Sequence, residues 1–275
     1  MSEEVQPVTQ FLEDSFVYSC SFKDQRGYDQ FVPHHVLAFQ FSGETRVQYQ
    51  NGKLVLRKNQ LLLVQKNQLA KSLKFPAETE AYKSISVILS DDVLRQYAIN
   101  NAIYESRPYT EEKIILLKPD ALMKSYFQSL LSYIEESENI SKKLAVIKTN
   151  EAIALLLHLS PSLKSFLFDF SEPHKIDLEK FMLQNYHYNV SIEEFAKLTG
   201  RSLASFKRDF SQVFKTSPRK WLQEKRLTQA YHLIQDKKQK PTEIYLELGF
   251  ENLSHFYTSF KQKFGVTPAT IQEFI

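Results

Sequence analysis

A dense run of positive charge lies between residues 201 and 240. This segment holds 11 Lys and Arg residues against three acidic ones, whereas the whole chain of 275 residues, with 35 basic and 32 acidic side chains, has a net charge of only +3. A clustered surplus of this kind attracts polyanions such as nucleic acids, and a well-solvated helical surface is the alternative. The first chemistry to consider is therefore recognition of phosphates and base edges.

A motif repeated at an offset of 50 residues flanks this charge. The first copy consists of Leu198, Ser202, Phe206, Phe210, Phe214 and Ser217-Pro218, and the second of Leu248, Asn252, Phe256, Phe260, Phe264 and Thr267-Pro268. Phenylalanines four residues apart share one helical face, Ser and Asn cap helix N-termini, and proline begins the next helix. Short predicted helices at 191–198 and 242–248, followed by Gly200 and Gly249, complete two helix-turn-helix patterns.

The outward faces of the two predicted second helices carry polar, basic and small apolar side chains. In a helix-turn-helix the second helix enters the major groove, where Arg pairs with guanine, Ser and Thr meet either partner, and apolar groups contact the thymine methyl. Some of these side chains will meet only solvent or phosphate, because half or more of protein–DNA hydrogen bonds go to the backbone. We expect the base-reading residues to be Ala204, Ser205, Lys207, Arg208, Leu253, Ser254, Tyr257 and Thr258.

A connecting helix is predicted from Pro218 to Gln235. Its roughly 18 residues span about 27 Å, and successive major-groove faces are about 34 Å apart, so a rod of this length can hold both reading helices on one side of a duplex. Basic and hydroxyl side chains near the ends of these helices are suited to phosphate. We expect the phosphate contacts to come from Arg201, Ser202, Arg219, Lys220, Lys261 and Lys263.

The N-terminal half reads as a β-rich domain. Short runs rich in Val, Leu, Phe and Tyr, separated by turn residues, predict a sandwich or small barrel, and Asn51-Gly52 predicts a two-residue hairpin turn. The predicted strands are Phe16–Cys20, Val36–Phe41, Thr45–Tyr49, Lys53–Leu56, Gln60–Val64 and Ser84–Leu89.

Helical periodicity follows the strands. A short helix is predicted over Asp91–Ile99, and two amphipathic helices over 119–136 and 140–159 form a hairpin that packs on the β domain or makes a dimer seam. Residues 160–173 are predicted to be a linker. We therefore expect an effector-sensing and dimerisation domain at 1–171 and a DNA-binding domain at 172–275.

The segment from about Lys175 to Phe274 resembles the DNA-binding domain of AraC/XylS-type transcription regulators. The matching residues are Ser191 to Gly200, Phe206 to Phe210, Trp221-Leu222, Arg226-Leu227, Ala230, Leu233-Ile234, Ile244, Leu248-Gly249-Phe250, His255-Phe256, Phe260-Lys261, Phe264-Gly265 and Thr267-Pro268. The resemblance implies seven helices with two helix-turn-helix units. It also implies sequence-specific binding to promoter DNA, usually with activation of transcription through contact with RNA polymerase.

Two residues depart from the family pattern, and the N-terminal half is similar to the family more loosely. Tyr245 replaces a common small Ala, and Thr258 stands where many members carry a base-reading Arg, which implies weaker reading by the second unit. The order of motifs from Phe31 to Leu54 is similar to the cupin-like effector and dimerisation domains of the subgroup that includes type III secretion activators. Such domains bind small molecules in some members and regulatory proteins in others.

A metal-dependent enzyme or sensor with a cupin-type barrel and an accessory nucleic-acid-binding domain is the alternative. His34 and His35 are adjacent, however, and neighbouring strand residues point to opposite faces of a sheet. The sequence also has no Gly-rich phosphate loop and no Gly-x-Ser-x-Gly elbow. The single cysteine, Cys20, cannot form an internal disulfide, which together with the absence of a signal peptide or a long apolar run predicts a cytoplasmic protein without membrane spans.

The sequence thus predicts an α+β protein: a β-rich, cupin-like domain with a helical hairpin, followed by an all-α domain with two helix-turn-helix motifs. The expected function is regulation of transcription, most simply activation, by a homodimer that binds double-stranded promoter DNA and RNA polymerase. A small-molecule or protein effector would control it. We expect no catalysis, no cofactor and no metal.

Overall fold

The computed structural model describes residues 8–26, 30–50, 52–104, 108–136, 140–171 and 175–273. The chain forms two compact units, Met1–Ser171 and Glu172–Ile275. The N-terminal unit combines strands with helices, and all the regular structure described in the C-terminal unit is helical. The protein is therefore of the α+β class, as the sequence predicts, and each unit is described by itself.

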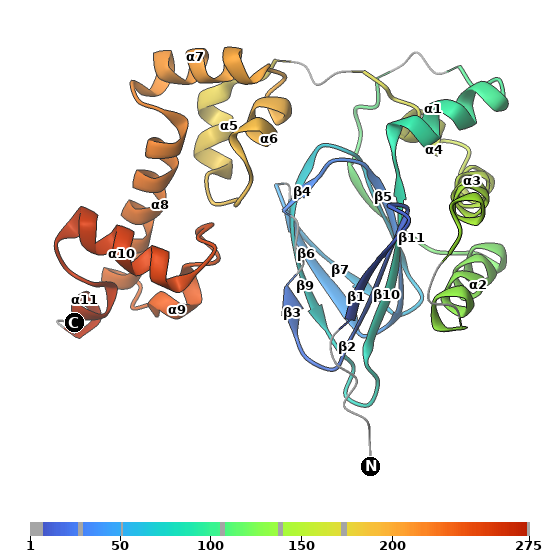
Figure 1. Ribbon diagram of the computed structural model, residues 1–275, viewed down its shortest axis with the longest axis horizontal. Helices are drawn as coiled ribbons and strands as arrows, with labels where there is room; N and C mark the ends of the chain where they lie inside the picture. Colours follow the sequence, from blue (N-terminus) through green and yellow to red (C-terminus); the bar gives the residue numbers. More distant parts are fainter. Residues whose placement is uncertain are drawn as a thin grey trace. The chain divides into compact units, whose positions relative to one another are not determined.

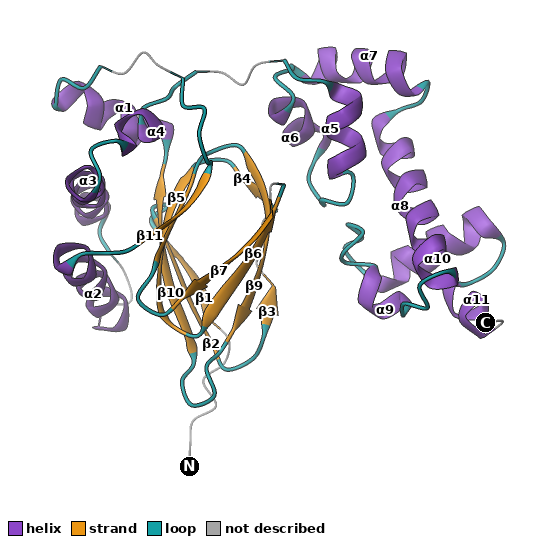
Figure 2. Cartoon of the chain, turned by 180° about the vertical axis from the view of Figure 1, so that it is seen from behind, coloured by secondary structure: helices purple, strands orange, loops and turns teal. Residues whose placement is uncertain are grey.

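Two antiparallel sheets face each other in the N-terminal unit (Figure 2). The strands of the first sheet, in spatial order, are β1 (Val8–Leu12), β2 (Phe16–Ser21), β10 (Tyr82–Leu89), β5 (His35–Ser42), β8 (Leu61–Val64) and β11 (Ile114–Leu117). Those of the second are β3 (Gln25–Arg26), β9 (Gln68–Phe75), β6 (Glu44–Tyr49) and β7 (Gly52–Arg57), with β4 (Phe31–Val32) paired to β9.

All six predicted strands are present, within a residue or two at their ends. Strands β6 and β7 form the predicted hairpin, since Tyr49 pairs with Gly52 across a two-residue connection; Asn51 itself lies outside the described residues. The sequence did not predict β1, β3, β4, β9 or β11. The two lysines of β9 interrupt its apolar pattern.

Helices cover the outer face of the six-stranded sheet (Figure 1). They are α1 (Asp91–Asn100), α2 (Ala121–Glu136), α3 (Lys142–Leu159) and α4 (Leu163–Leu167). Alternate sheet residues such as Phe16 and Ile85 join Phe127 and Leu156 in one core and are fully buried. The predicted hairpin therefore packs on the β domain, which is the first of the two uses expected for it.

The prediction of a linker over residues 160–173 is wrong for most of that segment. Helix α4 lies within it, and Phe166 and Leu167 are fully buried in the core of the N-terminal unit. The apolar side chains in the middle of the segment pack against the helices of the same unit.

Seven helices make up the C-terminal unit over the residues described there, the number that the family resemblance implies. They are α5 (Leu178–Asn185), α6 (Ile192–Leu198), α7 (Leu203–Phe214), α8 (Pro218–Gln235), α9 (Pro241–Ile244), α10 (Leu253–Phe264) and α11 (Pro268–Glu273). Helix α9 is shorter than the predicted helix 242–248, because the chain turns after Ile244. Phe206, Phe210, Phe256 and Phe260 are fully buried.

The repeat is also present in the helix ends. The side chains of Ser202 and Asn252 cap the N-termini of α7 and α10, by accepting hydrogen bonds from the amides of Ser205 and His255. Both helices end at a left-handed residue, Lys215 with φ 55° and Gly265 with φ 77°. A left-handed conformation places Cβ close to the following carbonyl, so the first copy carries strain that the second avoids.

Replacing Lys215 with Gly should therefore stabilise the protein. We expect the free energy of unfolding to rise by about 0.5–1 kcal/mol, because the relief of left-handed strain exceeds the extra entropy of glycine in the unfolded chain. Urea denaturation of the full chain measures the change. The control is Lys220→Gly, which places glycine in the first turn of α8 and should cost up to about 1 kcal/mol; equal losses for both variants would contradict the account.

Candidate functional site

Helix α7 exposes the face that the sequence assigns to reading bases. Ala204, Lys207 and Arg208 are exposed on the side away from the buried phenylalanines. The Arg208 side chain is 66% exposed, with Nη2 3.3 Å from Ser205 Oγ and 3.6 Å from Asp209 Oδ1. Its guanidinium is therefore accessible to a ligand and held near the N-terminal half of the helix.

Helix α10 matches the prediction less completely. Ser254, Thr258 and Lys261 are exposed, whereas Leu253 and Tyr257 are half-buried and pack against the core of phenylalanines. These two side chains thus belong partly to the scaffold of the unit. The sequence analysis missed His255, which is exposed in the first turn of α10, with Nε2 3.4 Å from Ser259 Oγ.

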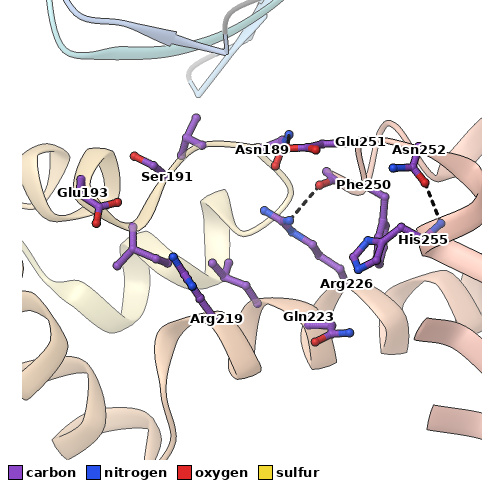
Figure 3. Close-up of a pocket in the computed structure, with 14 residues that line it drawn as sticks. Asn189, Ser191, Glu193, Arg219, Gln223, Arg226, Phe250, Glu251, Asn252 and His255 are labelled. Atoms are coloured by element: carbon purple, nitrogen blue, oxygen red, sulfur yellow. Dashed lines mark hydrogen bonds between the residues drawn. The ribbon is translucent and has the colours of Figure 1, made fainter. Parts of the chain in front are cut away.

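The C-terminal unit has two helix-turn-helix lobes, one of α5 to α7 and one of α9 to α11. The concave surface between them is here called the inter-lobe groove (Figure 3). One hollow of about 560 Å³ is lined by residues of α8 together with Asn252 and His255 at the start of α10. A second of about 430 Å³ includes Lys207 and Ser211 of α7. The two hollows share Ile192, Glu193 and Arg219.

The two adjacent hollows bring side chains of α7 and α10 to one groove. Helix α7 lies at one end of α8 and α10 toward the other (Figure 1). Lys207 and Ser211 of α7 line the second hollow, and Asn252 and His255 at the start of α10 line the first, so parts of both helices border the same groove.

Charge along the groove is mixed, with cations at the start of α8. Arg219 and Lys220 are exposed in its first turn, and the Lys220 ammonium lies only loosely against Glu224, at 4.0 Å. Glu193 and Glu251 add acidic groups to the lining. A ligand that fits this groove must therefore place negative charge near Arg219 and keep it away from Glu193 and Glu251.

Three of the predicted phosphate contacts have partners inside the unit instead. The Arg201 side chain is only 8% exposed and binds Asp209 Oδ2 at 3.1 Å, while its Nη1 donates to the carbonyls of Thr199 and Ile176. The Ser202 hydroxyl caps α7. Lys263 Nζ donates to Glu224 O at 2.7 Å and Thr228 Oγ1 at 2.8 Å. The sequence revealed their charge or polarity but not these partners.

The N-terminal unit contains a cavity between its two sheets. Its volume is about 300 Å³, and its lining is mainly apolar, with Val36, Leu62 and Val64 among the contributing side chains. Lys74 enters this lining with Nζ 2.8 Å from Ser19 Oγ and 5.7 Å from the centre of the Tyr82 ring. Burial lowers the pKa of Lys74. The cavity therefore offers an ammonium group within a mainly apolar wall.

His34 and His35 lie on opposite sides of the first sheet. His34 lines the cavity, whereas His35 is fully buried on the helical side, with Nε2 3.0 Å from Phe166 O. Burial, reinforced by the Lys66 charge, lowers the pKa of His35 to about 4. Across the described parts of the chain, no three His, Cys, Asp or Glu side chains are grouped so that they could hold a metal ion.

No helix in the described ranges combines the length and the apolar character needed to cross a bilayer.

Comparison with known proteins assigns the chain to a family. A helix-turn-helix domain model matches residues 195–273, and a model of the ExsA N-terminal regulatory domain matches residues 35–170. The chain belongs to the AraC/XylS family of transcription regulators.

The most similar relatives include activators of virulence genes. The chain is 28% identical over 162 residues to the virulence regulon transcriptional activator VirF of Yersinia enterocolitica, which is 58% of this chain and 59% of VirF. It is 32% identical over 128 residues to the HTH-type transcriptional regulator ExsA of Pseudomonas aeruginosa, 46% of each chain. The chain thus matches only about half the length of these relatives.

Among solved structures, ToxT of Vibrio cholerae aligns over 94% of this chain and 98% of its own. The sequence identity is 14% and the TM-score 0.44.

The low pKa of His35 predicts a specific pH dependence of stability. In the unfolded chain this imidazole has a pKa of 6.5, and in the folded protein about 4, so unfolding takes up a proton between these values. The free energy of unfolding should therefore fall as the pH falls from 6.5 to 4, by up to about 3 kcal/mol from this residue. Denaturation at a series of pH values measures the slope.

The control is His35→Gln, whose side-chain amide can still donate to Phe166 O but does not titrate. Its stability should depend less on pH in this window than that of the wild type. Equal slopes for both proteins would show that His35 does not contribute.

Lys74 should lower the free energy of unfolding of the unliganded protein. Its ammonium is taken out of water beside an apolar wall, so Lys74→Met should raise the free energy of unfolding, by roughly 0.5–2 kcal/mol. Chemical denaturation tests this, with Lys53→Met on the exposed face of β7 as the control, where a change within about 0.5 kcal/mol is expected. A loss of stability in Lys74→Met would show instead that the ammonium supports the fold.

Proposed function

We propose that this protein is a sequence-specific DNA-binding regulator of transcription, most simply an activator. The observation that carries the proposal is the pair of capped helices, α7 and α10, each of which contributes exposed side chains to one groove. An all-helical unit with two such helices suits two successive major-groove windows of one duplex. The similarity to VirF, a transcriptional activator, supports activation as the outcome.

The roles of individual side chains follow from their exposure. On α7, Arg208 would pair with guanine, Lys207 and Ser205 would reach neighbouring base edges, and Ala204 would contact a thymine methyl. On α10, Ser254 and Thr258 would read bases, with smaller contributions from the half-buried Leu253 and Tyr257. Arg219, Lys220 and Lys261 would bind phosphates.

The N-terminal unit would receive the signal and mediate dimerisation. Its cavity can hold a small ligand against Lys74, and its match to the ExsA N-terminal regulatory domain supports a regulatory role; a protein effector is the alternative. Leu122 of α2 and Val146 and Ile147 of α3 are each 53% exposed, although they are apolar. This surface favours the helical hairpin as the contact between two copies.

The proposed function involves no covalent chemistry. Its further partners would be RNA polymerase and a second copy of the chain, and it would act in the cytoplasm, where bacterial promoters are. An effector that prefers the DNA-competent arrangement would shift the population toward it.

Replacing Arg208 with Ala tests base reading. Duplexes are first selected from a random pool by the full chain, and affinities are then measured by fluorescence anisotropy for the selected sequence and its single-base variants. The variant should lose about 1–3 kcal/mol on the selected duplex and discriminate less at one base pair, because a bidentate contact to that base is lost.

Lys261→Ala is the matched control. It should weaken all duplexes by the same factor and reduce the slope of log affinity against log salt by about one, as expected for a lost phosphate contact. If Arg208→Ala also weakened all sequences equally, Arg208 would contact the backbone and not a base. If no duplex were selected at low salt, the proposed function itself would fail.

A further inference from the structure

Arg226, near the middle of α8, uses its guanidinium on backbone carbonyls. Nε donates to Tyr186 O at 2.8 Å, Nη2 to Tyr188 O at 2.8 Å and Nη1 to Gly249 O at 2.9 Å. Burial lowers the pKa of Arg226 to about 10, which leaves it charged at neutral pH. Each nitrogen of the guanidinium is thus held in a fixed direction.

The three carbonyls belong to the two different lobes. Tyr186 and Tyr188 lie between α5 and α6, in the first lobe, which comprises α5 to α7. Gly249 lies between α9 and α10, in the second lobe, which comprises α9 to α11. One side chain of the connecting helix therefore holds the turn segments of both lobes, and Figure 3 shows it at the floor of the inter-lobe groove.

Gly249 is shaped for this contact. Its φ is 86°, and a Cβ at this position would lie 2.9 Å from Arg226 Cζ and 2.9 Å from His187 O. A side chain here would push the guanidinium away. A second tie joins the same two segments, since Asn189 Nδ2 donates to Glu251 Oε1 at 3.3 Å.

We propose that Arg226 is the positioning residue that sets the separation and rotation between the reading helices α7 and α10. It thereby sets the number of base pairs that the DNA site must have between its two halves. The proposal rests on the proposed DNA-binding function. Without this tie the two lobes are coupled only through their separate packing on α8 and through the exposed Asn189–Glu251 contact.

The test uses the full chain and the duplex that it selects. It also uses duplexes in which one base pair is inserted or deleted midway between the two half-sites. An insertion rotates one half-site about the DNA axis and moves it along the axis, so a rigid protein should lose at least about tenfold in affinity. In Arg226→Met, which keeps the apolar stem and removes every donor, this penalty should fall below about threefold.

Ile234→Val separates positioning from general stability. This variant trims the core beneath α8 and costs about 0.5–1.5 kcal/mol, but it leaves the three hydrogen bonds intact. It should keep the wild-type penalty for altered spacing. If Arg226→Met does not fold, as judged by circular dichroism, Arg226→Lys takes its place, because a single ammonium cannot span three carbonyls.

The outcomes separate the two proposals. A wild-type protein that binds no duplex would overturn the proposed function. A wild-type protein that binds with a sharp spacing requirement, which Arg226→Met or Arg226→Lys retains in full, would overturn the role of Arg226 and leave the proposed function standing.

Discussion

Burial of the repeated phenylalanine stripe against α8 is the constraint on which the C-terminal unit depends. Trp221 packs on Phe214 with ring centres 4.6 Å apart near one end of this helix, and Tyr231 packs on Phe264 at 4.9 Å toward the other. Full burial contributes about 1.5–3 kcal/mol for each of Phe206, Phe210, Phe256 and Phe260. Because the stripe must face inward in both copies, the opposite faces of α7 and α10 must face outward.

The same principle, with a different period, organises the N-terminal unit. Along β5, Leu37 and Phe39 face the helices, whereas Val36 and Ala38 face the cavity between the sheets. One face of the six-stranded sheet thus makes the core, and the other lines a space that holds Lys74. The separation of His34 from His35 follows from this alternation, and it argues against a shared metal ion.

The sequence predicted the features that depend on local pattern and failed where distant contacts decide. The fifty-residue offset predicted the caps at Ser202 and Asn252 and the buried phenylalanines, because each depends on spacing within one helix. The partners of Arg201 and Arg226 could not be predicted in this way, since they lie on other elements. Strand β9 forms despite its lysines because pairing with β6 satisfies its backbone.

Protection of guanine N7 from methylation, measured on the duplex that the full chain selects, tests the central claim most directly, because N7 lies in the major groove. If α7 and α10 open to one side, two protected windows should lie on one face of the duplex, about one helical turn of 10–10.5 base pairs apart. Protection in a single window, or in two windows on opposite faces, would contradict the account.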